Sequence, residues 1–579
     1  MGSFVAVNCH PRDEVRSRRE HPRDHRTTSV PSGQAPSAHG DMARQNIDES
    51  HYPLIPDPKN PARILTRPDL LQQRIIFLSV VVILNIAMTA ITLLAKQSKL
   101  NVVVILAIKS KDFLSAVLSA TVLFFRWVGR GIRPPEPPVP RQWILSLIPA
   151  YSESEEQIVK TVYSLRDNGV GQHKQLMVIV LDGNPRDVRS HMTEVIREFE
   201  RPYVSLKWKK GVLRITVGFM EDVPVIVIEK VQNAGKKDSL VLCHDLFNYP
   251  RENSPRYTKL LREEMWDEIL PALTEGTDFK AFDMIFCTDA DSTIHQGAIA
   301  KLADALAKDD KAIAACGLVL VELEPGYEWS FWNLYQQFQY SFGQYVRRRA
   351  EGIMGKVTCL PGCVTMIAVR KEMAGAIRKY AEPVKGYVVL SHQVQYLGTD
   401  RRLTYSMLSQ GKHLRTLFVP DAVSETVAPQ SVAHYLSQRR RWGSNAFFNN
   451  YFYTAGERMT LFTRVCAAIE VVRLNLVYYR VVNTALFIHG LVTEEVSVLQ
   501  LIPMLIIGQF PTMWFFISVL IEKELRIRGH KLVLGFLINK VVSPFMSLII
   551  FTKVALNLGS QGTFSDPSKP PPSLAGPSS

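Results

Sequence analysis

Met284-Ile-Phe-Cys-Thr-Asp-Ala-Asp291 is the stretch that decides the fold of this chain. Its apolar start predicts a short buried strand, Met284–Thr288, and two carboxylates follow at the end of that strand. Because alternate residues of an extended chain point to the same side, Asp289 and Asp291 can reach one site. Carboxylate oxygens suit a hard cation such as Mg²⁺ or Mn²⁺, which would bridge to the phosphates of a substrate.

Further apolar runs alternate with amphipathic stretches on both sides of this strand. Alternation of this kind predicts an α/β domain with a mostly parallel central sheet. In such sheets ligands bind outside the carboxyl ends of the strands, which is where the two carboxylates lie. The other expected strands are Trp143–Ile148, Met177–Leu181, Val225–Ile228, Ile313–Leu320 and Val364–Val369.

Two apolar segments precede this domain. Ile75–Leu94 has no charged residue and can cross a hydrocarbon core of roughly 30 Å at ~1.5 Å per residue. A second span is expected within residues 102–128, although Lys109, Lys111 and Asp112 interrupt its apolar pattern. The alternative for this second segment is an amphipathic helix at the membrane surface.

Three more apolar segments follow the domain: Leu474–Val492, Val498–Ile521 and one within Leu532–Leu556. The loop Glu522–Lys531 is basic, whereas Thr493–Glu495 is acidic. The positive-inside rule therefore predicts that the basic loop and the large domain are cytoplasmic.

The 579 residues thus divide into five expected regions. They are a disordered tail 1–70, two transmembrane helices in 71–128, a cytoplasmic domain with interfacial helices in 129–457, three transmembrane helices in 458–558 and a disordered tail 559–579. The net charge of +14 fits cytoplasmic loops and an anionic substrate, and no basic stripe with interleaved aromatics indicates nucleic acid. Seven scattered cysteines show neither zinc-ligand spacing nor a disulfide framework.

Two segments near the expected sheet edge suit a nucleotide. Asp182 follows the strand Met177–Leu181 and could accept a hydrogen bond from the imide N–H of a uracil, although Asp-Gly is also an ordinary turn. Asn233–Ser239 places lysines at a glycine turn that opens a helix, which suits phosphate or base contacts. The alternative for this segment is a solvated helix start.

Gly398–Thr404 contains a candidate general base. Asp400 could take the proton of an acceptor hydroxyl, and the alternative is that Thr399 or Asp400 caps a helix. Upstream, Cys359-Leu-Pro-Gly-Cys363 could line the path of an acceptor or form a tight turn.

Gln438-Arg-Arg-Arg-Trp442 lies in a helix-compatible run. Arg441 can pair with two phosphate oxygens, and Trp442 offers a flat apolar face to a sugar ring. The alternative is a basic run at a membrane surface.

Together these strings resemble the processive inverting glycosyltransferases of family 2, and most closely the fungal chitin synthases. The resemblance covers about residues 140–560. Cellulose and hyaluronan synthases share the Asp-x-Asp, the later Asp and the Gln-x-x-Arg-Trp, but the cysteine-flanked Leu-Pro-Gly and the full Gln-Arg-Arg-Arg-Trp favour chitin synthase. Thr399 departs from the family's frequent Glu, and residues 558–563 lack the Trp that many members carry.

The resemblance implies a nucleotide-diphospho-sugar transferase that uses UDP-N-acetylglucosamine and Mg²⁺ or Mn²⁺. Its product would be a growing β-1,4-linked chitin chain that leaves through the C-terminal helices of a multi-pass plasma-membrane protein. Membrane lipid would surround these helices, and a homodimer is one assembly that the resemblance allows. The alternatives are a cellulose-type or hyaluronan-type synthase and a catalytically silent membrane scaffold.

Carried over by matching position, the family's site residues fall into four groups. Asp400 would be the base. The residues implied for the nucleotide are Asp182, Lys237, Ser239 and Asp289, those for the metal are Asp289 and Asp291, and those for the diphosphate and the acceptor chain are Gln438, Arg441 and Trp442.

Overall fold

The computed structural model describes residues 67–94, 98–129, 138–151, 153, 155–182, 204–208, 211–220, 222–230, 235–323, 326–382, 394, 398–493 and 498–558. The two expected tails lie outside these residues, except that the first helix begins within the N-terminal one, at Arg67. The first residues of the expected glycine turn, Asn233 and Ala234, and the acidic pair Glu494 and Glu495 also lie outside them.

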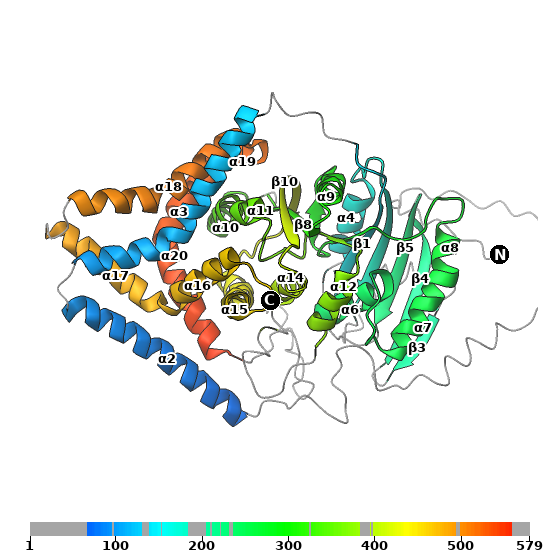
Figure 1. Cartoon of the computed structure of the whole chain (residues 1–579), viewed down its shortest axis with the longest axis horizontal. Coiled ribbons are helices and arrows are strands. Elements are labelled where there is room, and N and C mark those ends of the chain that lie inside the picture. The colour runs from blue at the N-terminus through cyan, green and yellow to red at the C-terminus, as the bar shows by residue number, and fades with distance from the viewer. Residues whose placement is uncertain are drawn as a thin grey trace, which may run out of the picture.

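Among the described residues, ten strands form one mixed sheet in the order β3-β4-β5-β2-β1-β6-β9-β8-β10-β7 (Figure 1). Strands β5, β2, β1 and β6 are parallel, and so is the pair β8-β10. The remaining pairs are antiparallel. The strands are β1 (Trp143–Ala150), β2 (Lys174–Leu181), β3 (Val204–Trp208), β4 (Gly211–Met220), β5 (Val223–Lys230), β6 (Met284–Cys287), β7 (Ser292–Ile294), β8 (Ala312–Val321), β9 (Thr365–Ala368) and β10 (Arg415–Thr426).

The expected strands are confirmed, and the parallel sheet that they predict is the centre of a larger mixed sheet. Side chains alternate across this centre, because successive residues of a strand face opposite sides. Leu145 and Leu147 enter one apolar cluster, whereas Ile144 and Ile148 enter the other. The parallel strands are therefore buried on both faces, as their continuous apolar sequence requires.

Helices cover both faces of the sheet (Figure 1). One face carries helices that share an apolar cluster: α6 (Lys236–Phe247), α7 (Arg256–Glu264), the π-helical turn η2 (Met265–Ile269), α8 (Leu270–Leu273), α12 (Glu372–Tyr380) and α14 (Thr399–Leu408). The other face carries α4 (Glu155–Arg166) and α9 (Ala298–Ala307).

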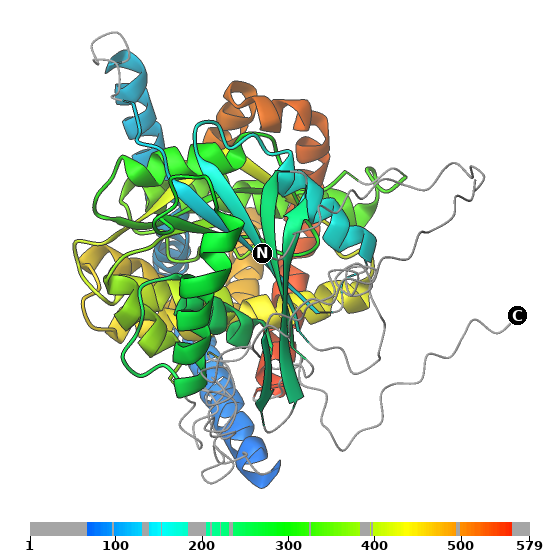
Figure 2. The same ribbon diagram turned by 90° about the vertical axis from the view of Figure 1, so that its right-hand side faces the viewer.

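The remaining helices gather beyond the β8-β10 side of the sheet, and Figure 2 views the molecule with the sheet in front of them. They are α2 (Arg67–Leu94), α3 (Ser98–Val128), α10 (Phe331–Phe342), η3 (Gly343–Arg348), α11 (Arg349–Ile353), α15 (Val432–Ala455), α16 (Leu461–Asn475), α17 (Val477–Val492), α18 (Val498–Ile521), α19 (Lys523–Ile527) and α20 (Gly529–Leu556).

Three helices in the described part of the chain are long and apolar enough to cross a membrane. Their candidate spans are Leu71–Leu94, Leu501–Ile521 and Gly529–Leu556. Helix α3 carries interrupting charges, and α17 has 16 residues, fewer than the roughly 20 that a span requires. The further spans expected at these two helices stay predictions.

The α18–α20 connection, residues 522–528, packs on the sheet domain instead of projecting from it. Phe515, Leu525 and Leu532 share a buried cluster with Leu320 of β8 and Val423 of β10. The basic loop expected at 522–531 therefore packs against the large domain. That the loop and the domain are both cytoplasmic stays a prediction.

Candidate active site

The loop between β6 and β7 presents the two expected carboxylates at the carboxyl edge of the sheet. Helix α4 supports this loop, because the Thr161 hydroxyl lies 2.9 Å from both the Ala290 and the Ser292 carbonyl oxygens. Burial, followed by the charges of Asp289 and Glu153, raises the pKa of Asp291 to about 6. Carboxylates crowded in this way favour a nearby cation.

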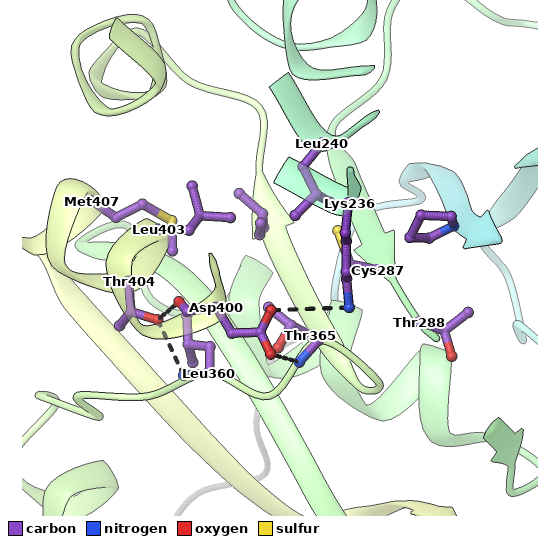
Figure 3. A pocket seen from close by; sticks show the side chains of 13 residues that line it. Lys236, Leu240, Cys287, Thr288, Leu360, Thr365, Asp400, Leu403, Thr404 and Met407 are labelled. Atoms are coloured by element: carbon purple, nitrogen blue, oxygen red, sulfur yellow. Dashed lines mark hydrogen bonds and ion pairs between the residues drawn. The ribbon is translucent and has the colours of Figure 1, made fainter. Parts of the chain in front are cut away.

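Lys236 supplies one such cation from the first residue of α6. Its Nζ forms an ion pair with Asp289 and lies 4.0 Å from Oδ1 of Asp400 (Figure 3). Burial by itself would lower the pKa of Lys236, but Asp289 and Asp400 raise it above the ordinary value. One ammonium group thus joins two carboxylates that the sequence places more than a hundred residues apart. The sequence pointed to this helix start but favoured Lys237 over Lys236.

Asp400 lies in the first turn of α14 and turns its carboxylate toward the pocket (Figure 3). The cap residue of this helix is Gly398, and no side chain caps its first turn, so the capping alternative for Thr399 or Asp400 is wrong. Oδ2 of Asp400 accepts a hydrogen bond from the Gly362 N–H at 3.1 Å, and Oδ1 accepts one from the Thr399 hydroxyl at 3.2 Å. These bonds fix the direction in which the carboxylate points.

The Cys359–Cys363 loop lines the pocket with Leu360 and Gly362. Its Leu360 N–H donates to the Thr404 hydroxyl of α14 at 3.1 Å. A Cβ atom on Gly362 would lie 2.6 Å from the Lys236 Nζ and 3.1 Å from Oδ1 of Asp400. A side chain at this position would therefore force Lys236 or Asp400 to shift, a constraint that the sequence did not reveal.

Apolar side chains complete the pocket around these polar groups (Figure 3). The lining residues are Pro149, Lys236, Leu240, Cys287, Thr288, Leu360, Gly362, Thr365, Ile367, Asp400, Leu403, Thr404 and Met407. The apolar walls strengthen the interaction between the lysine and the carboxylates, because they exclude water from one side.

Asp182 and Ser239, both expected at the nucleotide, meet in a buried network around Lys230. The Lys230 Nζ lies 2.9 Å from Oδ1 of Asp182, 2.8 Å from Asp238 and 3.1 Å from the Ser239 hydroxyl. Oδ2 of Asp182 accepts a hydrogen bond from the Gly235 N–H at 2.7 Å. This network, which the sequence did not predict, fixes the start of α6 and thereby the position of Lys236.

Lys237 points away from the carboxylates that its neighbour contacts. Its Nζ lies 5.1 Å from the centre of the Tyr380 ring, and the residue is 8% exposed. Burial, and secondly the charge of Arg402, lowers the pKa of Lys237 to about 7. The structure therefore places Lys236, and not Lys237, in the pocket.

The Gln438–Trp442 segment forms part of α15. Its Arg439 lies among aromatic rings, including one from this segment and one from α10. Arg439 lies 4.6 Å from the centre of the Trp442 ring and 5.4 Å from that of Tyr340. Trp442 remains 42% exposed. Within the described residues, Oε1 of Gln438 is buried without a hydrogen-bond partner.

Tyr340 packs on this segment, with the centre of its ring 5.7 Å from that of Trp442. Burial raises the pKa of its hydroxyl, and both Arg439 and Asp291 act on it electrostatically. The alternative of a basic run at the membrane surface does not describe Arg439, which packs inward on rings. Arg441 is half-buried in the same helix.

The donor set fits a divalent cation that is shared with a substrate. No group of three His, Cys, Asp or Glu residues in the described part of the chain could hold a metal by itself. Asp289 and Asp291 offer two carboxylates, and Mg²⁺ typically combines one or two of these with waters and substrate phosphates. The residues present therefore suit such an ion only together with a phosphate ligand.

A family model described as chitin synthase matches residues 211–549 of this chain. Chitin synthase 8 of Gibberella zeae is 26% identical over 371 residues, which are 61% of this chain and 54% of that protein. Chitin synthase 5 of Verticillium dahliae is 27% identical over 345 residues, which are 53% of this chain and 19% of that protein. The chain thus spans about half the length, or less, of these curated relatives.

Among solved structures, the chain is similar to a mannosyltransferase from Pyrobaculum calidifontis in complex with GDP-Man and Mn²⁺. The sequence identity is 12% and the TM-score 0.37, over 78% of this chain and 99% of the other.

Proposed function

Because the chain belongs to the chitin synthase family, we propose that it transfers N-acetylglucosamine from UDP-N-acetylglucosamine to the end of a growing β-1,4-linked chain. One observation carries the proposal: Lys236, which lines the pocket, pairs both with Asp289 on the carboxylate loop and with Asp400 of the same pocket. Inverting displacement requires a base for the acceptor hydroxyl and stabilisation of the departing diphosphate. The two carboxylates suit these two tasks.

Asp400 is proposed as the base. A carboxylate oxygen of Asp400 takes the proton of the acceptor hydroxyl while the acceptor oxygen bonds to the anomeric carbon of the donor sugar. The bond from that carbon to the diphosphate breaks, and UDP leaves. The Gly362 N–H and the Thr399 hydroxyl orient the carboxylate, and the Lys236 Nζ lies 4.0 Å from its Oδ1.

Asp289 and Asp291 are proposed to hold Mg²⁺ or Mn²⁺ together with the donor diphosphate. When bound, the cation would stabilise the negative charge that develops on the leaving UDP. Lys236 would add a positive charge beside it. Gln438, Arg441 and Trp442 are proposed to contact the diphosphate and the acceptor sugar, which is consistent with the exposed ring of Trp442.

The uridine is proposed to bind at the end of β2, beside Asp182 and Ser239. Both oxygens of Asp182 already accept a hydrogen bond, but each can accept a second one. The product is proposed to leave through the C-terminal helices of a plasma-membrane protein whose large domain is cytoplasmic.

The variant Asp400→Asn tests the base. We expect it to reduce polymer formation from UDP-N-acetylglucosamine by at least ~10²-fold, because an amide cannot accept the proton, while UDP binding persists. The measurement is incorporation of labelled sugar by detergent-solubilised protein, with chitinase digestion of the product. Near wild-type turnover by this variant would refute the role of Asp400. Separate assays with UDP-glucose and UDP-glucuronate distinguish a cellulose-type or hyaluronan-type synthase.

A further inference from the structure

Arg528 joins the membrane hairpin formed by α18, α19 and α20 to the interior of the sheet domain. The residue lies between α19 and α20 and is 5% exposed. Its Nη1 donates to the Val321 carbonyl oxygen at 2.6 Å, and its Nη2 forms an ion pair with Glu425. Val321 ends β8 and Glu425 lies in β10, which pairs with both β8 and the edge strand β7.

Glu425 also contacts His295, which lies just beyond the loop that carries the carboxylates. Its Oε1, which pairs with Arg528, also lies 3.0 Å from Nε2 of His295. Burial would raise the pKa of Glu425, but His295 and Arg528 hold it below its ordinary value. The glutamate is thus an ionised bridge between the hairpin and His295.

His295 directly follows β7, which directly follows Asp291. Strand β7 pairs with β10, so that Thr293 lies opposite Glu425 and Ser292 opposite Thr426. The His295 N–H also donates to the Val423 carbonyl oxygen at 3.0 Å. A displacement of Glu425 would therefore move the strand to which the carboxylate loop is attached.

We propose that Arg528 is a positioning residue that couples the C-terminal membrane hairpin to the Asp289–Asp291 loop through Glu425 and His295. The coupling makes the geometry of the donor site depend on the contact of the hairpin with Glu425 through Arg528. Only the identity of what the loop binds rests on the proposed function; the mechanical connection does not.

The chain offers a matched control for this connection. Arg349 of α11 also fastens the hairpin to the domain, with its Nη2 2.8 Å from Oε1 of Glu522. Both arginine side chains are largely buried, at 6% exposure for Arg528 and 11% for Arg349. Arg349 lies outside the Glu425–His295 connection, so its loss should loosen the hairpin without releasing the loop.

The test compares hydrogen–deuterium exchange of the peptide Thr288–His295 in purified full-length variants. Arg528→Gln and Glu425→Gln should each speed exchange of this peptide by about tenfold or more. The reason is that loss of a hydrogen bond to a charged group lowers the free energy of local opening, and the exchange rate rises accordingly. The double variant should add little to either change, because both break one connection. Arg528→Lys should restore part of the protection, and Arg349→Gln should leave the peptide unchanged.

A second measurement separates this inference from the proposed function. Mn²⁺ titration in the presence of UDP, followed by the electron paramagnetic resonance signal of free Mn²⁺, should show a several-fold weaker midpoint for Arg528→Gln and Glu425→Gln only. If wild-type protein binds no Mn²⁺, the proposed metal role fails while the exchange result still decides the coupling. Equal exchange of the peptide in Arg528→Gln, Glu425→Gln and wild type, or equal changes in Arg528→Gln and Arg349→Gln, overturns it.

Discussion

Gly362 is the residue at which the backbone comes closest to the charged centre of the pocket. The variant Gly362→Ala should lower turnover by about 10²-fold, because displacement of reacting groups by about 1 Å has that effect. The new Cβ would meet the Lys236 Nζ at 2.6 Å and force it or Asp400 to shift. Sugar incorporation per folded protein is the measurement. Gly343→Ala, where a Cβ meets nothing within 4 Å, is the control, and an equal loss in it would contradict the explanation.

Lys237 gives a prediction about stability and pH. Its pKa is about 7 in the folded protein and near the ordinary 10.5 when unfolded, so the unfolded chain binds more protons between these values. The contribution of this residue to the free energy of unfolding therefore rises with pH through that window.

Replacing Lys237 by Met should consequently stabilise the protein more at pH 6 than at pH 9. Thermal unfolding in detergent at both pH values measures this difference. Lys236→Met, in contrast, should abolish sugar transfer, because Asp289 and Asp400 lose the cation that they share. Equal stabilisation of Lys237→Met at the two pH values would contradict the lowered pKa.

The two lysines also show what could be predicted at this scale. Asp289, Asp291 and Asp400 stand out in the sequence because short motifs surround them. The choice between Lys236 and Lys237 depends on the residue at which α6 begins, and helix ends are poorly determined by local sequence. The Lys230 network joins Asp182 at the end of β2 to the start of α6, so no local pattern reveals it.

At the scale of elements, helix α4 supports the carboxylate loop through one hydroxyl. Thr161→Val should remove the hydrogen bonds to the Ala290 and Ser292 carbonyl oxygens, and destabilise the protein by about 1 kcal/mol. It should also weaken Mn²⁺ binding, because the loop is held less firmly. Thermal unfolding and Mn²⁺ titration check both effects. Thr161→Ser keeps the hydroxyl and should behave as wild type; a similar loss in it would attribute the effect to packing.

The elements that the sequence did not predict lie mainly at the ends of the sheet. Strand β10 contains Pro420 and shifts register against β8 between Val419 and Val423, so its pattern is interrupted. Proline is typical of bulges and edges, and lowers the expectation of a strand. Strand β7 has only three residues and exists because β10 offers it a partner. The central strands, in contrast, have apolar sequences that require burial on both faces.

At the scale of the whole molecule, both sets of apolar helices lie on one side of the sheet (Figure 1). The sequence predicted the order along the chain, with the transferase domain between the two sets. It did not predict that α18, α19 and α20 would complete the core of the domain. Leu525 and Leu532 are fully buried there, although the surrounding pattern resembles a membrane hairpin with a basic loop. The hydropathy of a segment indicates that its side chains avoid water. It does not indicate whether lipid or another part of the protein covers them.

This docking also has a consequence for the order in which the protein is made. Strand β8 leaves the ribosome long before the hairpin, because residues 312–321 precede residues 498–556 in the chain. The side chains of Leu318 and Leu320, which the hairpin helps to cover, therefore await their cover during synthesis. A newly made domain with exposed apolar surface is prone to aggregate. Completion of the domain core thus waits for α18, α19 and α20 to dock on β8 and β10.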